Sequence, residues 1–227
     1  MTDKILILST PRTGSNLLCE CLTQTQQIGH VDGFFVGFGD GIKRDYAERC
    51  DLYYHGHCNE ETGAYATKIM WDYIDHMADL VTYKSVYEHF FYQFNQVVWL
   101  YRQDEIAQAV SWYMAINSGK WTSKNDQKRP FPNYNFSHIA WFVGKIRSYN
   151  ERTRHFIETS GLEYRAKISY EHIVGDLDSA VGAILGSGDE FSFKPTLERQ
   201  NNPLKAEFIE RFKEDMECQQ VLQNSLG

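Results

Sequence analysis

The run from Ser9 to Asn16 combines several groups that bind anions. It reads Ser9-Thr10-Pro11-Arg12-Thr13-Gly14-Ser15-Asn16 and lies between an apolar segment and a segment with helical spacing. The N–H groups at the start of a helix are unpaired and carry a partial positive charge, so a loop that leads into them is a ready anion site. Gly14 lets the backbone approach a ligand closely, and Arg12 adds a cationic donor. The sequence therefore predicts an anion site here, against the alternative of an ordinary capped helix after a turn.

This loop lacks the features with which nucleoside triphosphatases bind ATP. Their motif GxxxxGK[ST] begins with a glycine and ends with a lysine and a magnesium-binding hydroxyl. This chain has no glycine at the start of the loop, and no lysine followed by Ser or Thr at its end. These absences argue against an ATPase or a kinase. A nucleotide kinase or nucleotidase that uses the same strand–loop–helix stays open as an alternative.

Arg102 and Ser111 form a second pair with the chemistry of a phosphate site. Arg102 follows an apolar run that predicts a strand, and Ser111 lies within the next predicted helix. Ligands of open α/β sheets bind at the carboxyl ends of the strands, which is where Arg102 would lie. A guanidinium together with a hydroxyl suits a terminal phosphate. The alternative is an arginine paired with Asp104 or Glu105, beside a solvated serine.

These residues are carried by alternating strands and helices. Short apolar runs predict strands, and apolar residues at helical spacing predict helices. The predicted strands are 4–9, 65–69, 97–101 and 163–169; the predicted helices are 14–25, 71–94, 103–118, 136–158, 177–186 and 204–222; the predicted loops are 26–45, 119–134 and 187–203. Strands that alternate with helices indicate an α/β fold of three layers with a mainly parallel sheet. No linker divides the chain, so we expect residues 1–227 to form a single domain.

The composition narrows the class of partner. The chain has 227 residues, 42% of them hydrophobic, and 23 basic against 30 acidic residues give a net charge of −7. This acidic balance argues against a nucleic-acid partner and against a polybasic membrane anchor. A small anionic ligand is still allowed, because local N–H groups and arginines can oppose the overall field. No apolar stretch is long enough for a signal peptide or a membrane span, so no integral membrane segment is expected.

The cysteines indicate reduced thiols. They stand at 19, 21, 50, 58 and 218, an odd number without a CxxC pair. A structural zinc site takes about four ligands at suitable spacing, which these positions do not offer. Free thiols are typical of a cytoplasmic protein, and we expect that location.

Several stretches resemble the PAPS-dependent sulfotransferases, in particular the small bacterial carbohydrate sulfotransferases of the trehalose type. PAPS is 3′-phosphoadenosine 5′-phosphosulfate. The matching stretches are TPRTGSNLL at 10–18, TKIMW at 67–71, WLYRQDEIAQAVSWYMAINSGKW at 99–121, ISYEHI at 168–173 and KPTLERQ at 194–200. The resemblance implies a P-loop-like α/β fold, PAPS as the sulfuryl donor and no metal ion. It further implies an acceptor that is a small carbohydrate, a glycolipid headgroup or a related polar metabolite, and it is compatible with a homodimer.

The resemblance also implies roles for individual residues. The side of the donor that carries the 5′-phosphosulfate would be bound by Pro11, Arg12, Thr13, Gly14, Ser15 and Asn16. Arg102 and Ser111 match the pair that binds the 3′-phosphate, and Arg199 in the 194–200 loop would close over the nucleotide. The reaction would be an in-line transfer to a hydroxyl, in which Arg12 stabilises charge on the departing phosphate. Lys68 either approaches this site from its strand end or is solvated over a packed stem.

The chain departs from the family where the general base is expected. In the trehalose enzymes the loop after the first helix reads roughly G-E-P-x-E-x-F, and a glutamate there acts as base. This chain has His30 and Gly33 at the two glutamate positions, with Asp32 one residue away. Asp32 is one candidate base and His30, whose imidazole ordinarily titrates near neutrality, is another. The alternatives are that Asp32 is a turn residue and His30 a surface histidine, and that another group or none acts as the base.

The missing glutamate leaves a further reading open. A sulfotransferase-like protein that kept its nucleotide site and lost its base would bind the donor without turnover. The sequence therefore carries three hypotheses: an active sulfotransferase, a catalytically inactive nucleotide-binding relative, and a nucleotide kinase. Turnover with an acceptor separates the first from the second, and magnesium-independent binding of the 3′-phosphorylated nucleotide excludes the third.

Overall fold

The computed structural model describes residues 2–34, 46–124, 126–198 and 202–225. The chain divides into two compact units, the first formed by Met1–Tyr101 and Asn150–Pro195, the second by Arg102–Tyr149 and Thr196–Gly227. Each unit is described by itself below. The single domain expected from the sequence stays a prediction.

The first unit is built on a parallel sheet of four strands. The strands are β1 (Lys4–Ser9), β2 (Tyr65–Met70), β3 (Gln96–Tyr101) and β4 (Glu163–Ser169), in the spatial order β2-β1-β3-β4. Ile7 of β1 pairs with Lys68 on one side and with Val98 on the other. The chain leaves β1 towards β2 and then crosses to β3, so the strand order reverses between β1 and β3. In open α/β sheets ligands bind outside the carboxyl ends of the strands at such a point.

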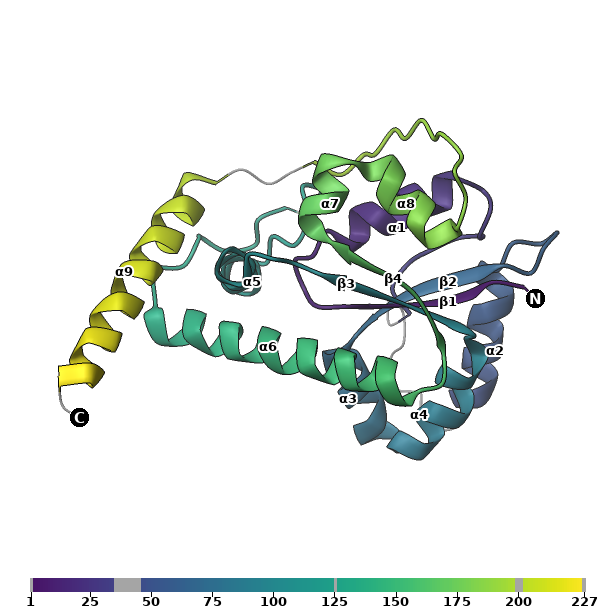
Figure 1. Ribbon diagram of the computed structural model, residues 1–227, viewed down its shortest axis with the longest axis horizontal. Coiled ribbons are helices and arrows are strands. Elements are labelled where there is room, and N and C mark those ends of the chain that lie inside the picture. Colours follow the sequence, from purple (N-terminus) through teal and green to yellow (C-terminus); the bar gives the residue numbers. More distant parts are fainter. Residues whose placement is uncertain (1, 35–45, 125, 199–201, 226–227) are drawn as a thin grey trace. The chain divides into compact units, whose positions relative to one another are not determined.

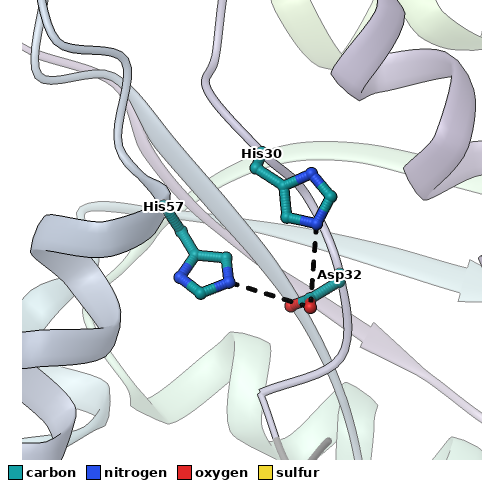
Figure 2. Close-up of side chains that lie close together, drawn as sticks. All are labelled: His30, Asp32 and His57. Carbon is teal, nitrogen blue, oxygen red and sulfur yellow. Dashed lines mark ion pairs between the residues drawn. The ribbon is translucent and has the colours of Figure 1, made fainter.

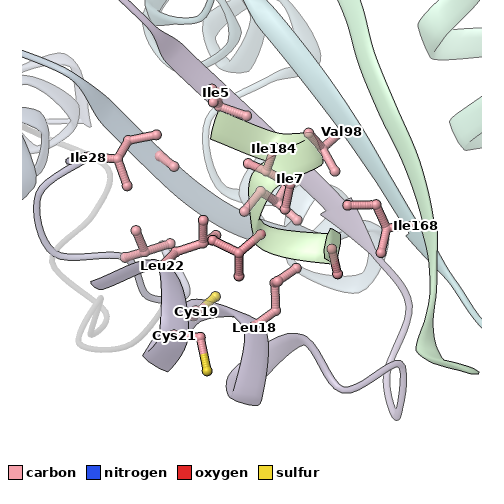
Figure 3. Close-up of a cluster of buried hydrophobic side chains, with 14 of the residues drawn as sticks. Ile5, Ile7, Leu18, Cys19, Cys21, Leu22, Ile28, Val98, Ile168 and Ile184 are labelled. Atoms are coloured by element: carbon pink, nitrogen blue, oxygen red, sulfur yellow. The ribbon is translucent and has the colours of Figure 1, made fainter. Parts of the chain in front are cut away.

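One face of this sheet is covered by aliphatic packing. The helices on this face are α1 (Ser15–Gln24), α7 (Tyr170–Gly175) and α8 (Leu177–Leu185) (Figure 1). Ile5 and Ile7 of β1 meet Leu18 and Leu22 of α1, and Ile184 of α8 closes the cluster (Figure 3). All five side chains are almost fully removed from water. The i, i+4 spacing on α1 places both leucines on the face that meets the sheet.

The opposite face is covered by aromatic packing. Its helices are α2 (Tyr46–His57), α3 (Trp71–Leu80) and α4 (Tyr83–His89), followed by a 3₁₀ turn at Phe91–Gln93. Tyr65 of β2 stacks on Phe94 with ring centroids 5.7 Å apart, and Phe90 lies edge-on to Phe94. Helices on both faces of a parallel sheet confirm the three-layer α/β/α fold predicted from the sequence.

The second unit is helical. It contains α5 (Glu105–Ser118), most of α6 (Phe136–Thr159) and α9 (Pro203–Ser225), with α6 ending in the first unit. Phe136 stacks on Phe212 with centroids 4.9 Å apart, and Tyr134 donates a hydrogen bond to Asp215 at 2.5 Å. Gly119, at φ 75°, ends α5 where the sequence predicts its end. Two elements, α2 and α7, have no counterpart among the predicted helices.

Candidate functional site

The loop between β1 and α1 has an unusual backbone. Arg12 adopts φ 71° and Gly14 φ 74°, both in the left-handed region. For a residue with a side chain this conformation costs about 1–3 kcal/mol and is found where surrounding contacts impose it. Thr13 is fully buried, and its Oγ1 donates to the carbonyl of Thr10 at 2.9 Å. The loop is therefore held in shape by its own buried hydroxyl, with Arg12 on the strained segment.

The N-terminal end of α1 has features of an anion-binding site. Among the described residues no side chain caps this end, and its first turn carries no acidic residue. The first N–H groups of the helix have no acceptor within the helix, and no acidic residue of the described first turn offsets their partial positive charge. Gly14 stands where a Cβ would lie 2.9 Å from Cδ2 of Tyr170, so the ring of Tyr170 closes against the loop. Glycine is required here by both conformation and space.

Lys68 brings a cation to this loop. Lys68 lies on β2 and is only 8% exposed, and its Nζ donates to Oδ1 of Asn16 at 2.6 Å. Asn16 lies in the first turn of α1, so the ammonium group reaches the same end of the helix as Arg12. This bears out the first of the two readings of Lys68, in which it approaches the predicted anion site.

Asp32 lies between two histidines (Figure 2). Its Oδ2 is 3.9 Å from Nε2 of His30 and 3.7 Å from Nε2 of His57. The two imidazole rings have centroids 5.5 Å apart. The side chains of His30, Asp32 and His57 are 60%, 33% and 22% exposed, so the cluster opens to solvent on the side of His30.

Backbone and side-chain bonds place this cluster beside β2. The carbonyl of Asp32 accepts from the backbone N–H of Lys68 at 2.9 Å and from Oγ1 of Thr67 at 3.0 Å. The hydroxyl of Tyr53 donates to Oδ1 of Asp32. The backbone of Asp32 is thus bonded to Lys68, whose side chain is bonded to Asn16. The structure thereby brings both candidate bases and the anion loop into one region of the first unit.

Cys19 shows how closely these groups approach α1. Burial raises the pKa of its thiol to about 11, while the charge of Lys68 lowers it and that of Asp32 adds to the rise. A thiol with a raised pKa is a poor nucleophile near neutral pH. Cys19 therefore contributes packing rather than chemistry, although the charged groups of the site lie within electrostatic reach of it.

The second unit holds the other predicted pair. Arg102 and Ser111 are both buried, at 9% and 7% exposure. A cavity of about 420 Å³ is lined by Ser111 together with Lys120, Ser123, Phe131, Glu198 and Lys205, among others. Arg199 lies outside the described residues. Glu198 just before it donates its backbone N–H to Oγ of Ser123 at 3.0 Å, and Lys124 donates to Thr196. The described start of the 194–200 loop therefore packs on the 119–134 segment.

Sequence reasoning missed two residues of the cluster, Tyr53 and His57. They stand four residues apart on α2, so they share one face of that helix. His57 Nδ1 lies 2.8 Å from the carbonyl oxygen of Tyr53, and the two rings stack with centroids 3.9 Å apart. The i, i+4 pair is readable in the sequence, but nothing local connects it with Asp32.

Comparisons with known proteins agree on one family. A family model described as Stf0 sulphotransferase matches residues 4–215. Trehalose 2-sulfotransferase of Mycolicibacterium smegmatis is 27% identical over 123 residues, which are 52% of this chain and 46% of that protein. The same enzyme of Mycobacterium tuberculosis is 27% identical over 120 residues, 51% of this chain and 45% of that protein. The chain thus matches somewhat less than half the length of these relatives.

Solved structures of low sequence identity resemble the chain as well. A sulfotransferase from Alicyclobacillus acidocaldarius is 14% identical, with a TM-score of 0.49 over 95% of this chain and 93% of that one. Retinol dehydratase in complex with androsterone and the inactive cofactor PAP is 12% identical, with a TM-score of 0.39 over 93% of this chain and 63% of that one. Within the described ranges, no helix is long and apolar enough to cross a membrane.

Proposed function

The chain belongs to the Stf0 sulphotransferase family, and we propose that it transfers a sulfuryl group from PAPS to a hydroxyl of a small carbohydrate. One observation carries the proposal: Lys68 joins the anion loop, through Asn16, to the backbone of Asp32. A donor-binding loop and a carboxylate base are the two parts that sulfuryl transfer to a hydroxyl needs. The residues that we propose for both parts belong to the first unit.

The loop from Pro11 to Asn16 would bind the 5′-phosphosulfate. The N-terminal N–H groups of α1 and the ammonium of Lys68 supply positive potential there, and Arg12, a residue of the same loop, would add its guanidinium. Arg102 and Ser111 would bind the 3′-phosphate, as the resemblance to the family implies. The cavity beside Ser111, with its two lysines, supports an anionic ligand in the second unit. Arg199 would close over the bound nucleotide.

The reaction would be a single in-line displacement. The acceptor oxygen attacks sulfur, the bond from sulfur to the 5′-phosphate oxygen breaks, and 3′-phosphoadenosine 5′-phosphate leaves. The acceptor proton passes to the base, for which Asp32 is the first candidate and His30 the second. Charge that grows on the departing phosphate is stabilised by Arg12, Lys68 and the helix N-terminus, so positioning and electrostatics supply most of the rate.

The acceptor is proposed by class only. The curated relatives act on trehalose, as their names state. In this chain His30 and Gly33 occupy the two glutamate positions of the trehalose-type loop, so the acceptor side of the site differs. A sugar or glycolipid headgroup is therefore proposed, and trehalose itself is one member of the panel to be tested. A homodimer also stays a prediction.

Calorimetric titration with 3′-phosphoadenosine 5′-phosphate tests the donor site. AMP, ADP and ATP are the comparison ligands, each with and without magnesium. We expect the bisphosphate to bind without magnesium and AMP to bind at least tenfold more weakly, because AMP lacks the 3′-phosphate. Tighter binding of magnesium ATP would overturn the proposal in favour of a kinase.

Turnover separates an active enzyme from an inactive relative. The chain is incubated with PAPS and a panel of sugars that includes trehalose, and transfer is followed by release of the bisphosphate nucleotide. Nucleotide release that depends on an acceptor supports the proposal. Tight binding of the bisphosphate with no turnover on any acceptor would favour the hypothesis of a non-catalytic relative, which the missing loop glutamate supports.

A further inference from the structure

We propose that His30, Asp32 and His57 form a binding site for a divalent transition-metal ion, with Zn²⁺ as the best match. Each of the three residues offers one ligand atom within 4.8 Å of the others, and the histidine atoms that face Oδ2 of Asp32 are both Nε2 (Figure 2). Two imidazole nitrogens and one carboxylate oxygen are a ligand set that zinc accepts readily. A metal ion bound here would occupy both candidate bases, Asp32 and His30, so the metal-bound chain is expected not to transfer a sulfuryl group by the reaction proposed above, and turnover is expected of the metal-free chain.

The spacing is close to what zinc requires. Ligand atoms about 2.0–2.1 Å from a tetrahedral zinc ion lie about 3.4 Å from one another. Oδ2 of Asp32 is 3.7 Å from Nε2 of His57 and 3.9 Å from Nε2 of His30. The two pairs that include Asp32 need to close by a few tenths of an ångström, and the pair of imidazole nitrogens, which lies within 4.8 Å, by at most about 1.4 Å. His30 is the most exposed of the three side chains, so it is the one with room to move.

His57 is oriented as a metal ligand. Its Nδ1 lies 2.8 Å from the carbonyl oxygen of Tyr53. A carbonyl only accepts, so Nδ1 carries the proton, and in the neutral ring Nε2 turns a lone pair towards Oδ2 of Asp32. Two acceptors facing each other repel unless a proton or a metal ion lies between them. Metal-binding histidines commonly donate their other ring N–H to a backbone carbonyl in this way.

The surrounding bonds hold the other two ligands in place. Tyr53 donates its hydroxyl to Oδ1 of Asp32, which leaves Oδ2 to face the imidazoles. The backbone N–H of His30 donates to the carbonyl of His57 at 2.9 Å, which ties the loop that carries two ligands to the helix that carries the third. Three protein ligands leave a coordination position open for water.

Cobalt absorption and zinc calorimetry on the chelator-treated full chain test the site. Co²⁺ alone is added first, and we expect visible d–d bands of a low-coordinate ion at one equivalent per chain, displaced by Zn²⁺. His57→Ala should weaken binding by more than the ~10–100-fold that is typical of losing an outer-shell partner. His55→Ala is the matched control, since His55 is an exposed histidine on the same helix, and it should bind as the wild type does.

Two further variants keep the result interpretable. Tyr53→Phe removes the hydroxyl that orients Asp32 and keeps the backbone carbonyl that orients His57. It should therefore weaken metal binding less than His57→Ala does. Cys58→Ser should leave binding unchanged, because the thiol of Cys58 is not a proposed ligand. Circular dichroism of each variant checks that the fold is retained.

Three outcomes would overturn the site. They are the absence of a bound equivalent, equal binding by His57→Ala and wild type in folded proteins, and a sulfur-to-cobalt charge-transfer band that disappears in Cys58→Ser. In the first case a proton on Nε2 of His57, and not a metal, would satisfy the carboxylate. Nucleotide binding is measured on the same preparation without metal, so failure of the metal site and failure of the sulfotransferase proposal are told apart.

Discussion

Lys68 donates a hydrogen bond from Nζ to Oδ1 of Asn16 at 2.6 Å, which joins β2 to the first turn of α1. The two residues are 52 positions apart in the chain. The bond holds a cation at the end of the helix where the anion loop opens. The same lysine pairs through its backbone with Asp32 and Phe34, so one residue of β2 touches both parts of the proposed active site.

Lys68→Met is therefore expected to weaken binding of 3′-phosphoadenosine 5′-phosphate by about 10–100-fold, the range for one charge-assisted hydrogen bond. Methionine keeps a stem of similar length and removes the charge. Calorimetry gives the affinity. Lys84→Met is the control, because Lys84 is an exposed lysine paired with Glu88 on α4 and should leave the affinity unchanged. Equal affinity of Lys68→Met and wild type would remove Lys68 from the donor site.

Gly14→Ala is expected to destabilise the protein by about 1–3 kcal/mol, because a Cβ at φ 74° is strained and would meet Tyr170 at 2.9 Å. Denaturant unfolding gives the free energy. Gly144→Ala is the matched control: this glycine lies inside α6 with open space around its Cβ, and alanine there should stabilise by about 0.5–1 kcal/mol. Equal stability of Gly14→Ala and wild type would show that Tyr170 and the loop have room to shift.

The elements that were predicted well are those whose pattern is local. The strands predicted at 4–9 and 163–169 have the bounds of β1 and β4. Helix α2 was missed because only Tyr46 and Cys50 are buried along it, too few for a visible stripe. Helix α7 was missed because it has six residues, although Ser169 caps it by accepting from the N–H of His172. Both helices are stabilised by tertiary packing more than by their own sequence.

The residues of the candidate site also fall into those that a local sequence pattern predicts and those that only tertiary packing brings together. The anion loop is contiguous in sequence and precedes a helix, so its position could be predicted, as could Asp32 and His30 in the loop that follows. His57 and Tyr53 could not, because they reach Asp32 only through the folding of α2 against β2. The alternative proposed for Lys68, a solvated side chain, could be rejected only once its distance to Asn16 was known.

Arg12→Ala and Arg102→Ala are each expected to weaken binding of the bisphosphate nucleotide by about 10–100-fold or more, since each removes a charged donor to a phosphate. The effects should differ by ligand. Loss of Arg102 should leave the already weak affinity for AMP nearly unchanged, because AMP has no 3′-phosphate. Loss of Arg12 should instead weaken binding of both AMP and the bisphosphate nucleotide. Arg154→Ala, an exposed arginine on α6 paired with Glu151, serves as the control. Unchanged binding in both variants would refute the assignment of the two phosphate positions.

Asp32→Asn is expected to lower kcat of sulfuryl transfer by about 10²–10⁴-fold, the usual contribution of a positioned base, with donor affinity nearly intact. Asparagine keeps an oxygen that can accept from the hydroxyl of Tyr53, so the loop should stay in place. His30→Gln tests the second candidate base in the same assay. The larger loss of kcat identifies the base, and wild-type turnover in both variants would place proton transfer on another group.

Cys50 reports whether α2, the helix that carries Tyr53 and His57, packs as described. Burial raises the pKa of its thiol to about 12, while a hydrogen bond with Tyr46 opposes the rise. At pH 8 its thiolate fraction is then about a thousandfold below that of an ordinary thiol of pKa near 9. As pH rises above 9, the unfolded thiol loses its proton before the folded one, so this group's contribution lowers stability with rising pH.

Iodoacetamide labelling at pH 8, read by mass spectrometry, should modify exposed Cys218 rapidly and leave Cys50 unmodified. Similar labelling of Cys50 and Cys218 in the native chain would show that α2 opens, and with it the cluster around Asp32.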